Sequence, residues 1–149
     1  MIIRIQTEDF DVAALNRELI AGRSDVGAIA SFIGLVRDLE GDSLQRMTLE
    51  HYPGMTENAL RRIAEQAQQR WKLIDLGVIH RVGDLEPADQ IVLVTVLSAH
   101  RGDAFSACEF IMDYLKTDAP FWKKEVSEQG SNWVASRDSD EEARKKWES

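Results

Sequence analysis

The chain has 149 residues, 44% of them hydrophobic, which suits a single domain, residues 1–149, with its own core. Acidic residues outnumber basic ones by 26 to 18, and the net charge of −8 argues against general nucleic-acid binding, which needs a basic surface. The apolar runs are too short for a membrane-spanning helix and the N-terminus lacks a signal-peptide core, so we expect a soluble cytoplasmic protein. The chain has one cysteine, so we expect no disulfide within it. No cysteine or histidine cluster has the spacing of zinc ligands, so we expect neither a bound metal nor a cofactor.

The first third of the chain predicts a strand, a helix and two further strands. Residues 2–5 predict the first strand, and Asp11 is the expected cap of a helix that stops at Gly22. Residues 26–36 are apolar and β-branched enough for a buried strand. Residues 44–52 alternate in polarity, so we expect these last two strands to pair as a hairpin.

The middle of the chain predicts a helix followed by two more strands. The Pro53-Gly54 pair breaks the preceding strand, and Thr56 is the expected N-cap of a helix with an apolar stripe over residues 60–71. Residues 73–82 predict a strand. Residues 90–99 form the most strand-like segment of all, and we expect them in the centre of a sheet.

The last third predicts a long helix and a hairpin. Asp103 is the expected cap of a helix with Phe105 on its apolar face, and Pro120 ends it because the residue before a proline avoids helical geometry. Residues 121–126 and 132–135 are expected to pair.

The tail predicts one more helix and completes the fold class. Residues 139–147 indicate a short, charged and solvated helix. Strands and helices are interspersed and several connections are short. This pattern favours an α+β fold with mixed or antiparallel strand pairing.

Cations gather after the central strand of this acidic chain. His100 and Arg101 stand where that strand ends and a helix begins, a place where backbone N–H groups and the helix dipole favour an anion. Lys116 lies in the last turn of the helix, and Lys123 follows the break at the proline. Neighbours on a strand point to opposite faces, so only one of Lys123 and Lys124 can share a site with Lys116. The pattern indicates a small anion site.

The same residues also have plain structural explanations. A lysine in the last turn of a helix stabilises the helix dipole, and Arg37 at the end of a strand is equally a solvated rim residue. Cys108 lies on an apolar helix face, which favours a buried, inert thiol over a reactive one. His51 and His80 are expected to be structural.

At these residues the chain resembles the large, catalytic subunit of molybdopterin synthase. The resemblance extends over nearly the whole chain, through Trp147, and its motifs occur in the family's order. Four stretches carry it: FIGLVR (residues 32–37), LEHYPGM (49–55), SAHR (98–101) and FIMDYLKTDAPFWKK (110–124).

The resemblance implies an α/β hammerhead-type fold with an additional small β-sheet region. It also implies a homodimer on which two small ubiquitin-like subunits dock, giving a heterotetramer. Each small subunit inserts a Gly-Gly tail that carries a thiocarboxylate. The implied activity is that of a sulfurtransferase in molybdenum cofactor biosynthesis, which moves two sulfurs to cyclic pyranopterin monophosphate and forms the dithiolene of molybdopterin.

The resemblance also assigns roles to individual positions. Lys116 matches a lysine beside the inserted tail, and Lys123 matches a second lysine essential to the reaction. The other matches hold the phosphate-bearing pterin, in a pocket that the dimer partner helps to build, or flank that pocket: Arg37, His100, Arg101, Lys124, Glu125 and Arg137. Leu35 stands where relatives often have a lysine, which removes one possible substrate contact unless the side chain faces the core.

Two other functions fit parts of the pattern. The cations alone would also suit a non-catalytic module that binds an anionic peptide tail or a phosphorylated ligand. Cys108 would be the reactive group of a thiol-dependent sulfurtransferase that carries a persulfide.

Overall fold

The computed structural model describes the backbone of residues 1–37, 44–127, 130–134 and 138–148, and the side chains of 1–37, 46–124 and 140–148. The fold is α+β, as predicted, with two four-stranded sheets of strand order β1-β4-β6-β2 and β5-β3-β7-β8. The elements follow in chain order: β1 (Ile2–Gln6), α1 (Val12–Ile20), β2 (Ala28–Leu35), β3 (Leu44–His51), α2 (Met55–Arg70), β4 (Asp75–Arg81), β5 (Gly83–Leu85), β6 (Gln90–Ser98), α3 (Arg101–Asp118), β7 (Phe121–Ser127), β8 (Gly130–Val134) and α4 (Asp138–Lys145).

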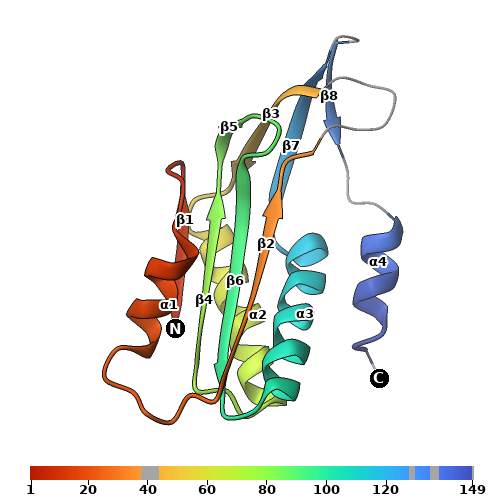
Figure 1. The fold of residues 1–149 in the computed structure, drawn as a ribbon. Coiled ribbons are helices and arrows are strands. Elements are labelled where there is room, and N and C mark those ends of the chain that lie inside the picture. Colours follow the sequence, from red (N-terminus) through yellow and green to blue (C-terminus); the bar gives the residue numbers. More distant parts are fainter. Residues whose placement is uncertain (38–43, 128–129, 135–137, 149) are drawn as a thin grey trace.

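The first sheet is the main sheet, with helices on both faces (Figure 1). Strand β6 is central, as predicted, and every pairing in this sheet is antiparallel except that of β1 with β4. Val92, Val94 and Val96 of β6 belong to the core cluster on the side of α2 and α3. Leu93 and Leu97 point to the opposite face, where they pack with α1. Because both faces of β6 are buried, its sequence is a nearly continuous apolar run, interrupted by Thr95.

The second sheet extends the fold beyond one end of the main sheet (Figure 1). Strand β3 pairs with β5 and β7, and β7 pairs with β8 as the sequence predicted. The predicted hairpin between residues 26–36 and 44–52 is wrong, because β2 pairs with β6 in the main sheet and, within the described part of the chain, with no other strand. The turn expected between them, residues 38–42, lies outside the described residues. The apolar run of residues 26–36 and the alternation of residues 44–52 each correctly predicted a strand but did not identify its partner.

Three predicted helix starts have different outcomes. Asp11 caps α1 as expected, with its carboxylate accepting from the amides of Ala13 and Ala14. Helix α2 has Gly54 as its N-cap, at φ 85°, so the assignment of Thr56 as the cap is wrong. Helix α3 begins at Arg101, and Asp103 therefore lies in its first turn instead of capping it.

The burial predicted for β2 is wrong. Only Ala30 is buried in this strand, and Ile29 and Phe32 are exposed because β2 is an edge strand of the main sheet. Leu35 is 53% exposed and faces no core. Phe105, expected on the buried face of α3, is 66% exposed beside the same edge. An apolar surface therefore follows β2 and the neighbouring part of α3.

The C-terminal segment is less solvated than its charge predicts. The Trp147 ring packs edge-on against Phe110, with 5.5 Å between centroids, and its Nε1 donates to the Asp113 carboxylate at 2.7 Å. The Arg70 guanidinium lies over the same ring and donates to the Trp147 carbonyl at 2.9 Å. Helix α4 is thus fastened to α2 and α3 by an aromatic anchor that charge patterning did not indicate.

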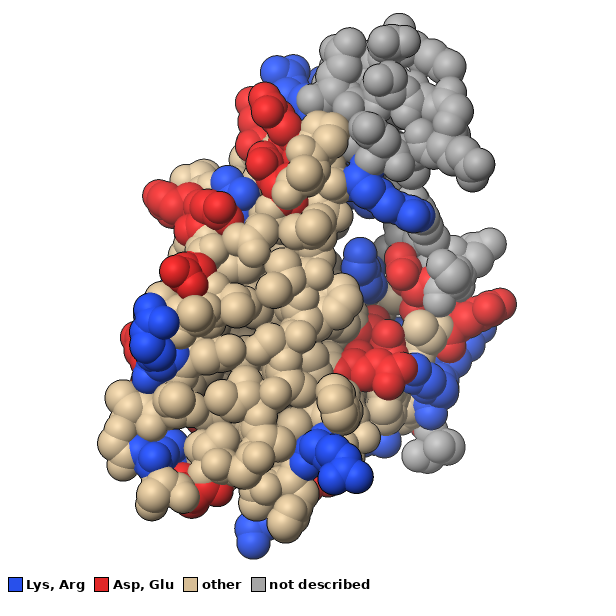
Figure 2. Space-filling model, viewed as in Figure 1, with Lys and Arg blue, Asp and Glu red and all other residues tan. Residues whose placement is uncertain are grey.

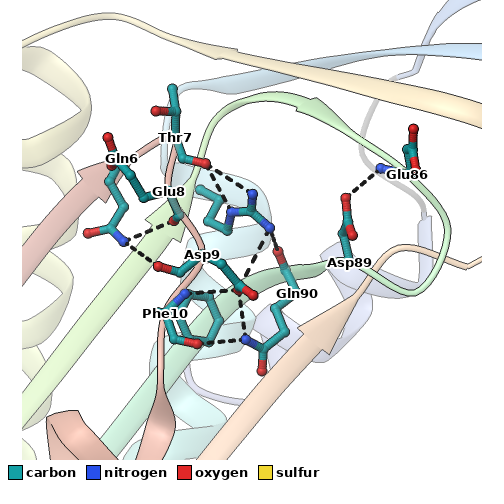
Figure 3. A network of polar contacts seen from close by, with 9 residues as sticks. Gln6, Thr7, Glu8, Asp9, Phe10, Glu86, Asp89 and Gln90 are labelled. Carbon is teal, nitrogen blue, oxygen red and sulfur yellow. Dashed lines mark hydrogen bonds and ion pairs between the residues drawn. The ribbon is translucent and has the colours of Figure 1, made fainter.

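A polar network fastens the segment after β1 to the main sheet (Figure 3). The Arg81 guanidinium donates to the Thr7 and Gln90 carbonyls, and the Gln90 side chain donates to Asp9 and to the Phe10 carbonyl. The hydrogen bonds from Gln90 and from the Phe10 amide hold the pKa of Asp9 below its ordinary value. These groups hydrogen-bond to one another, so we assign the network a structural role.

None of the described helices has the length and apolarity that a membrane crossing requires.

Candidate functional site

The two lysines singled out by the sequence lie on either side of the junction between α3 and β7. Lys116 is exposed in the last turn of α3, and Lys123 is half-buried on β7. Lys123 pairs with Leu49, which belongs to the core below the second sheet, whereas Lys124 pairs with Thr48. Cross-strand partners share a face, so Lys123 points to the inner face of the second sheet and Lys124 to the outer face.

The inner face of β7 meets the main sheet beside these lysines. Phe121 precedes Lys123 by two residues on the same face, and its ring stacks on His80 of β4 with 3.8 Å between centroids and 17° between planes. Lys116 is close enough for its charge to lower the pKa of His80. Figure 2 shows lysine and arginine side chains at an opening in the region where α3, β2 and the second sheet meet. The structure therefore brings Lys116 and the face carrying Lys123 to one region.

His80 is a buried, neutral group behind this region. The residue is 5% exposed, and its Nδ1 lies 2.8 Å from the Arg81 carbonyl, which can only accept, so Nδ1 carries a hydrogen. Burial lowers the pKa of His80 to about 4, and the charges of Lys116 and His51 act in the same direction. At neutral pH the imidazole adds no charge beside the lysines.

A groove of about 480 Å³ leads away from Lys116 between β2 and α3. Its wall is mainly apolar where the edge strand faces the helix, and carboxylates stand along its rim. The lining residues are Ala30, Ser31, Phe32, Phe105, Cys108, Glu109, Met112, Asp113, Lys116 and Asp140. The arrangement suits an extended chain of small cross-section that ends near a cation.

Cys108 lies in the wall of this groove but is buried, as the sequence predicted. Its thiol donates to the Val94 carbonyl at 3.7 Å. Burial raises its pKa to about 11, so the thiol is protonated at neutral pH. A thiol in this state is a poor nucleophile, which disfavours the persulfide-carrier hypothesis.

The remaining pterin-binding candidates divide between the two ends of α3. Arg37 is exposed just beyond β2, at the end of the main sheet where Lys116 also lies. His100 and Arg101 are exposed at the other end, where the Ser98 hydroxyl donates to the His100 carbonyl. Over the 15 residues from Arg101 to Lys116, a rise of ~1.5 Å per residue gives a separation of about 22 Å along the helix axis. One copy of the chain therefore does not bring all these cations together.

Two candidates are only partly described or not described. Glu125 lies on β7, but its side chain is outside the described residues, and so is the whole of Arg137. Among the described residues, no cluster of His, Cys, Asp and Glu is arranged to hold a metal ion.

Sequence reasoning missed two residues of this region. Thr56, assigned to the start of α2, is fully buried, and its hydroxyl donates to the Pro120 carbonyl at the α3–β7 junction. His80 carried no sequence signal beyond its place on a strand. The only hint for either was an isolated polar residue beside an apolar pattern.

Comparison with known proteins finds relatives over nearly the whole chain. The family described as MoaE protein matches residues 5–118. A molybdopterin synthase catalytic subunit of Ralstonia nicotianae (strain ATCC BAA-1114 / GMI1000) is 61% identical over 146 residues, covering 97% of this chain and 83% of that protein. The solved molybdopterin biosynthesis MoaE protein from Burkholderia ambifaria MC40-6 is 53% identical, with a TM-score of 0.86 and coverage of 99% and 98%. The solved molybdopterin synthase from Staphylococcus aureus is 32% identical, with a TM-score of 0.82 and coverage of 89% and 96%.

Proposed function

Because this chain belongs to the MoaE protein family, we propose that it is the catalytic subunit of a molybdopterin synthase. In this proposal it is a sulfurtransferase that acts in the cytoplasm. Two sulfurs pass to cyclic pyranopterin monophosphate, one from each of two thiocarboxylated tails of the small ubiquitin-like subunit, giving the dithiolene of molybdopterin. The observation that carries the proposal is the meeting of Lys116 and the Lys123-bearing face of β7 at one end of an apolar groove.

The groove suits the tail of the small subunit. A Gly-Gly segment has no bulky side chain and carries one negative charge at its end. The apolar wall, which includes Phe32 and Met112, would accept the extended backbone while excluding water. Lys116 at the mouth would then pair with the thiocarboxylate.

Lys123 has the complementary role. It is half-buried on the inner face of β7, and in the proposed complex the bound tail and pterin would exclude water from it, which makes its charge interactions stronger than in water. We assign to Lys116 and Lys123 the stabilisation of negative charge that develops on oxygen and sulfur during transfer.

A homodimer would complete the pterin pocket. In a two-fold pair the same surface meets itself, so two copies of β2 and α3 would run antiparallel across the interface. The partner subunit's His100 and the partner subunit's Arg101 would then approach Lys116 and Arg37. The exposed apolar side chains along β2, together with Phe105, provide a surface that such a pairing would bury.

The other assignments follow from this arrangement. Arg37, His100 and Arg101 would hold the phosphate and the polar edge of the pterin, since arginine binds phosphate through paired hydrogen bonds. The pocket would be flanked by Lys124, Glu125 and Arg137. With one small subunit on each copy, the assembly would be a heterotetramer.

The test is dithiolene formation from purified protein, thiocarboxylated small subunit and pterin substrate. We expect Lys116→Ala to lower turnover by about 10²-fold or more, the range found on removing a group that stabilises transition-state charge. Lys72→Ala, at a lysine just after α2, is the matched control and should retain turnover. Wild-type turnover in Lys116→Ala would exclude the proposed role.

The non-catalytic binding module makes a different prediction. If only charge mattered at position 116, Lys116→Arg would preserve function. Loss of turnover in this variant, with unchanged binding of the small subunit, would exclude a module that merely binds an anion.

A further inference from the structure

Thr56 is a buried hydroxyl with two hydrogen-bond partners in different parts of the fold. Its side chain is fully buried in the first turn of α2. Oγ1 accepts from the Tyr52 amide at 3.0 Å and donates to the Pro120 carbonyl at 3.0 Å, across 64 residues of sequence. Loss of either partner would leave a buried polar group unpaired, which costs free energy. The two hydrogen bonds therefore hold the Tyr52 and Pro120 segments in place against α2.

The Pro120 carbonyl belongs to a tight turn between α3 and β7. The Phe121 amide donates to the Ala119 carbonyl at 2.8 Å, which closes a three-residue turn around the proline. Proline has no amide hydrogen, so its carbonyl is its only backbone hydrogen-bonding group. The Thr56 hydroxyl occupies that carbonyl and fixes the turn to α2.

This turn lies between the two reactive lysines. Lys116 precedes Pro120 by four residues and Lys123 follows it by three. On the strand side, Phe121 is held by its stack on His80. On the helix side, Ala119 is buried in the main core. Rotation about the turn would change the orientation of the strand that carries one lysine relative to the helix that carries the other.

We propose that Thr56 is a positioning residue for sulfur transfer: its hydroxyl fixes the turn at Pro120 and thereby the spacing of Lys116 and Lys123. The proposal rests on the function proposed above. Thr56 touches neither lysine and acts through the backbone. Because small displacements of reacting groups lower rates strongly, loss of the hydroxyl should affect the chemical step more than substrate binding.

Thr95 provides a matched control within the same fold. It is equally buried, and its hydroxyl bonds to Asn16 and Ser31 on the face of the main sheet below α1. Valine is isosteric with threonine but lacks the hydroxyl, so Thr56→Val and Thr95→Val remove the same chemical group from two buried sites. Only the first is bonded to the turn between the lysines.

The experiment compares steady-state turnover of Thr56→Val, Thr56→Ser and Thr95→Val in the reconstituted complex, below the melting temperature of each variant. We expect kcat of Thr56→Val to fall by about 10-fold or more, with KM for the pterin changed by less than about 2-fold. Thr56→Ser keeps the hydroxyl and should recover most of kcat. Thr95→Val should lose stability but keep kcat.

Amide hydrogen exchange gives a readout that does not depend on activity. Exchange over residues 119–123 should accelerate in Thr56→Val and stay unchanged in Thr95→Val. Equal kcat in Thr56→Val and Thr95→Val, or unchanged exchange over this segment, would overturn the positioning role. If Thr56→Val does not fold, Thr56→Ala against Thr95→Ala makes the same comparison.

The two proposals fail in different ways. Absence of dithiolene formation by the wild-type complex would overturn the proposed function, whatever the variants do. A wild-type complex that turns over, together with a fully active Thr56→Val, would overturn only the role of Thr56.

Discussion

The two ends of α3 carry the candidate cations, but they are built differently. At the C-terminal end, buried groups surround the chain next to Lys116: the Thr56 hydroxyl binds the following turn, and Phe121 stacks on the neutral His80. At the N-terminal end, His100 and Arg101 are exposed, and His100 caps the helix without a side-chain hydrogen bond.

This difference in burial between the two ends of α3 indicates which part of the proposed site a single copy of the chain can form by itself. A braced end fixes the backbone on either side of the turn between its lysines, as the proposed catalysis would require. An exposed end holds two cations that only a second surface would bury. The C-terminal end is therefore expected to be the reactive end, and the N-terminal end is expected to serve the site of the other copy.

The largest effect is expected from mixed dimers, which test the division between the two ends. Lys116→Ala and Arg101→Ala should each be nearly inactive as homodimers. In the proposed dimer each site takes Lys116 from one copy and Arg101 from the other. A mixed dimer that pairs the Lys116→Ala subunit with the Arg101→Ala subunit, purified through two different tags, then contains one site with both changes and one site with neither. It should regain about half of the wild-type activity, since a two-fold dimer has two equivalent sites.

The reciprocal pairing is the control. A subunit carrying both substitutions, paired with a wild-type subunit, should be inactive because each site then contains one change. Half activity in this control, with none in the first mixed dimer, would show that each site lies within a single chain.

The pH dependence of stability tests the bracing at the C-terminal end. The pKa of His80 is about 4 in the folded protein, against about 6.5 in an exposed histidine. Above pH 6.5 both states hold it neutral, so it adds no pH dependence. As the pH falls from 6.5 towards 4, only the unfolded state gains the proton, and stability should fall by up to about 1.4 kcal/mol per pH unit.

Urea denaturation at a series of pH values measures this slope. His80→Gln has no ionisable group at this position and should lose that part of the dependence. A wild-type slope equal to that of His80→Gln would mean that His80 is accessible to protons in the folded state.

The smallest effect is expected midway along α3, where Cys108 lies between the two ends. Because its thiol is buried and protonated, Cys108→Ala should keep full turnover in the reconstituted assay. A modest decrease in melting temperature is expected from the lost packing. Loss of turnover without loss of structure would support the persulfide-carrier hypothesis after all.

Part of the site was predictable from local sequence. Lys116 in the last turn of a helix and the break at Pro120 both follow from rules that act over a few residues. The choice of Lys123 over Lys124 needed the strand register, which depends on pairing with β3. The partnership of Thr56 with Pro120 joins residues 64 positions apart and has no local signal.

The sequence by itself determined the helices, the strands other than the short β5, the central place of β6 and the identity of the cations, because periodicity, capping and composition are local properties. Tertiary structure decided that β2 is an exposed edge, that β3 belongs to a second sheet, and that the cations lie at opposite ends of α3. These features depend on which surfaces pack together. The alternation of a strand and the periodicity of a helix stay the same whichever partner covers the apolar face, so neither pattern identifies that partner.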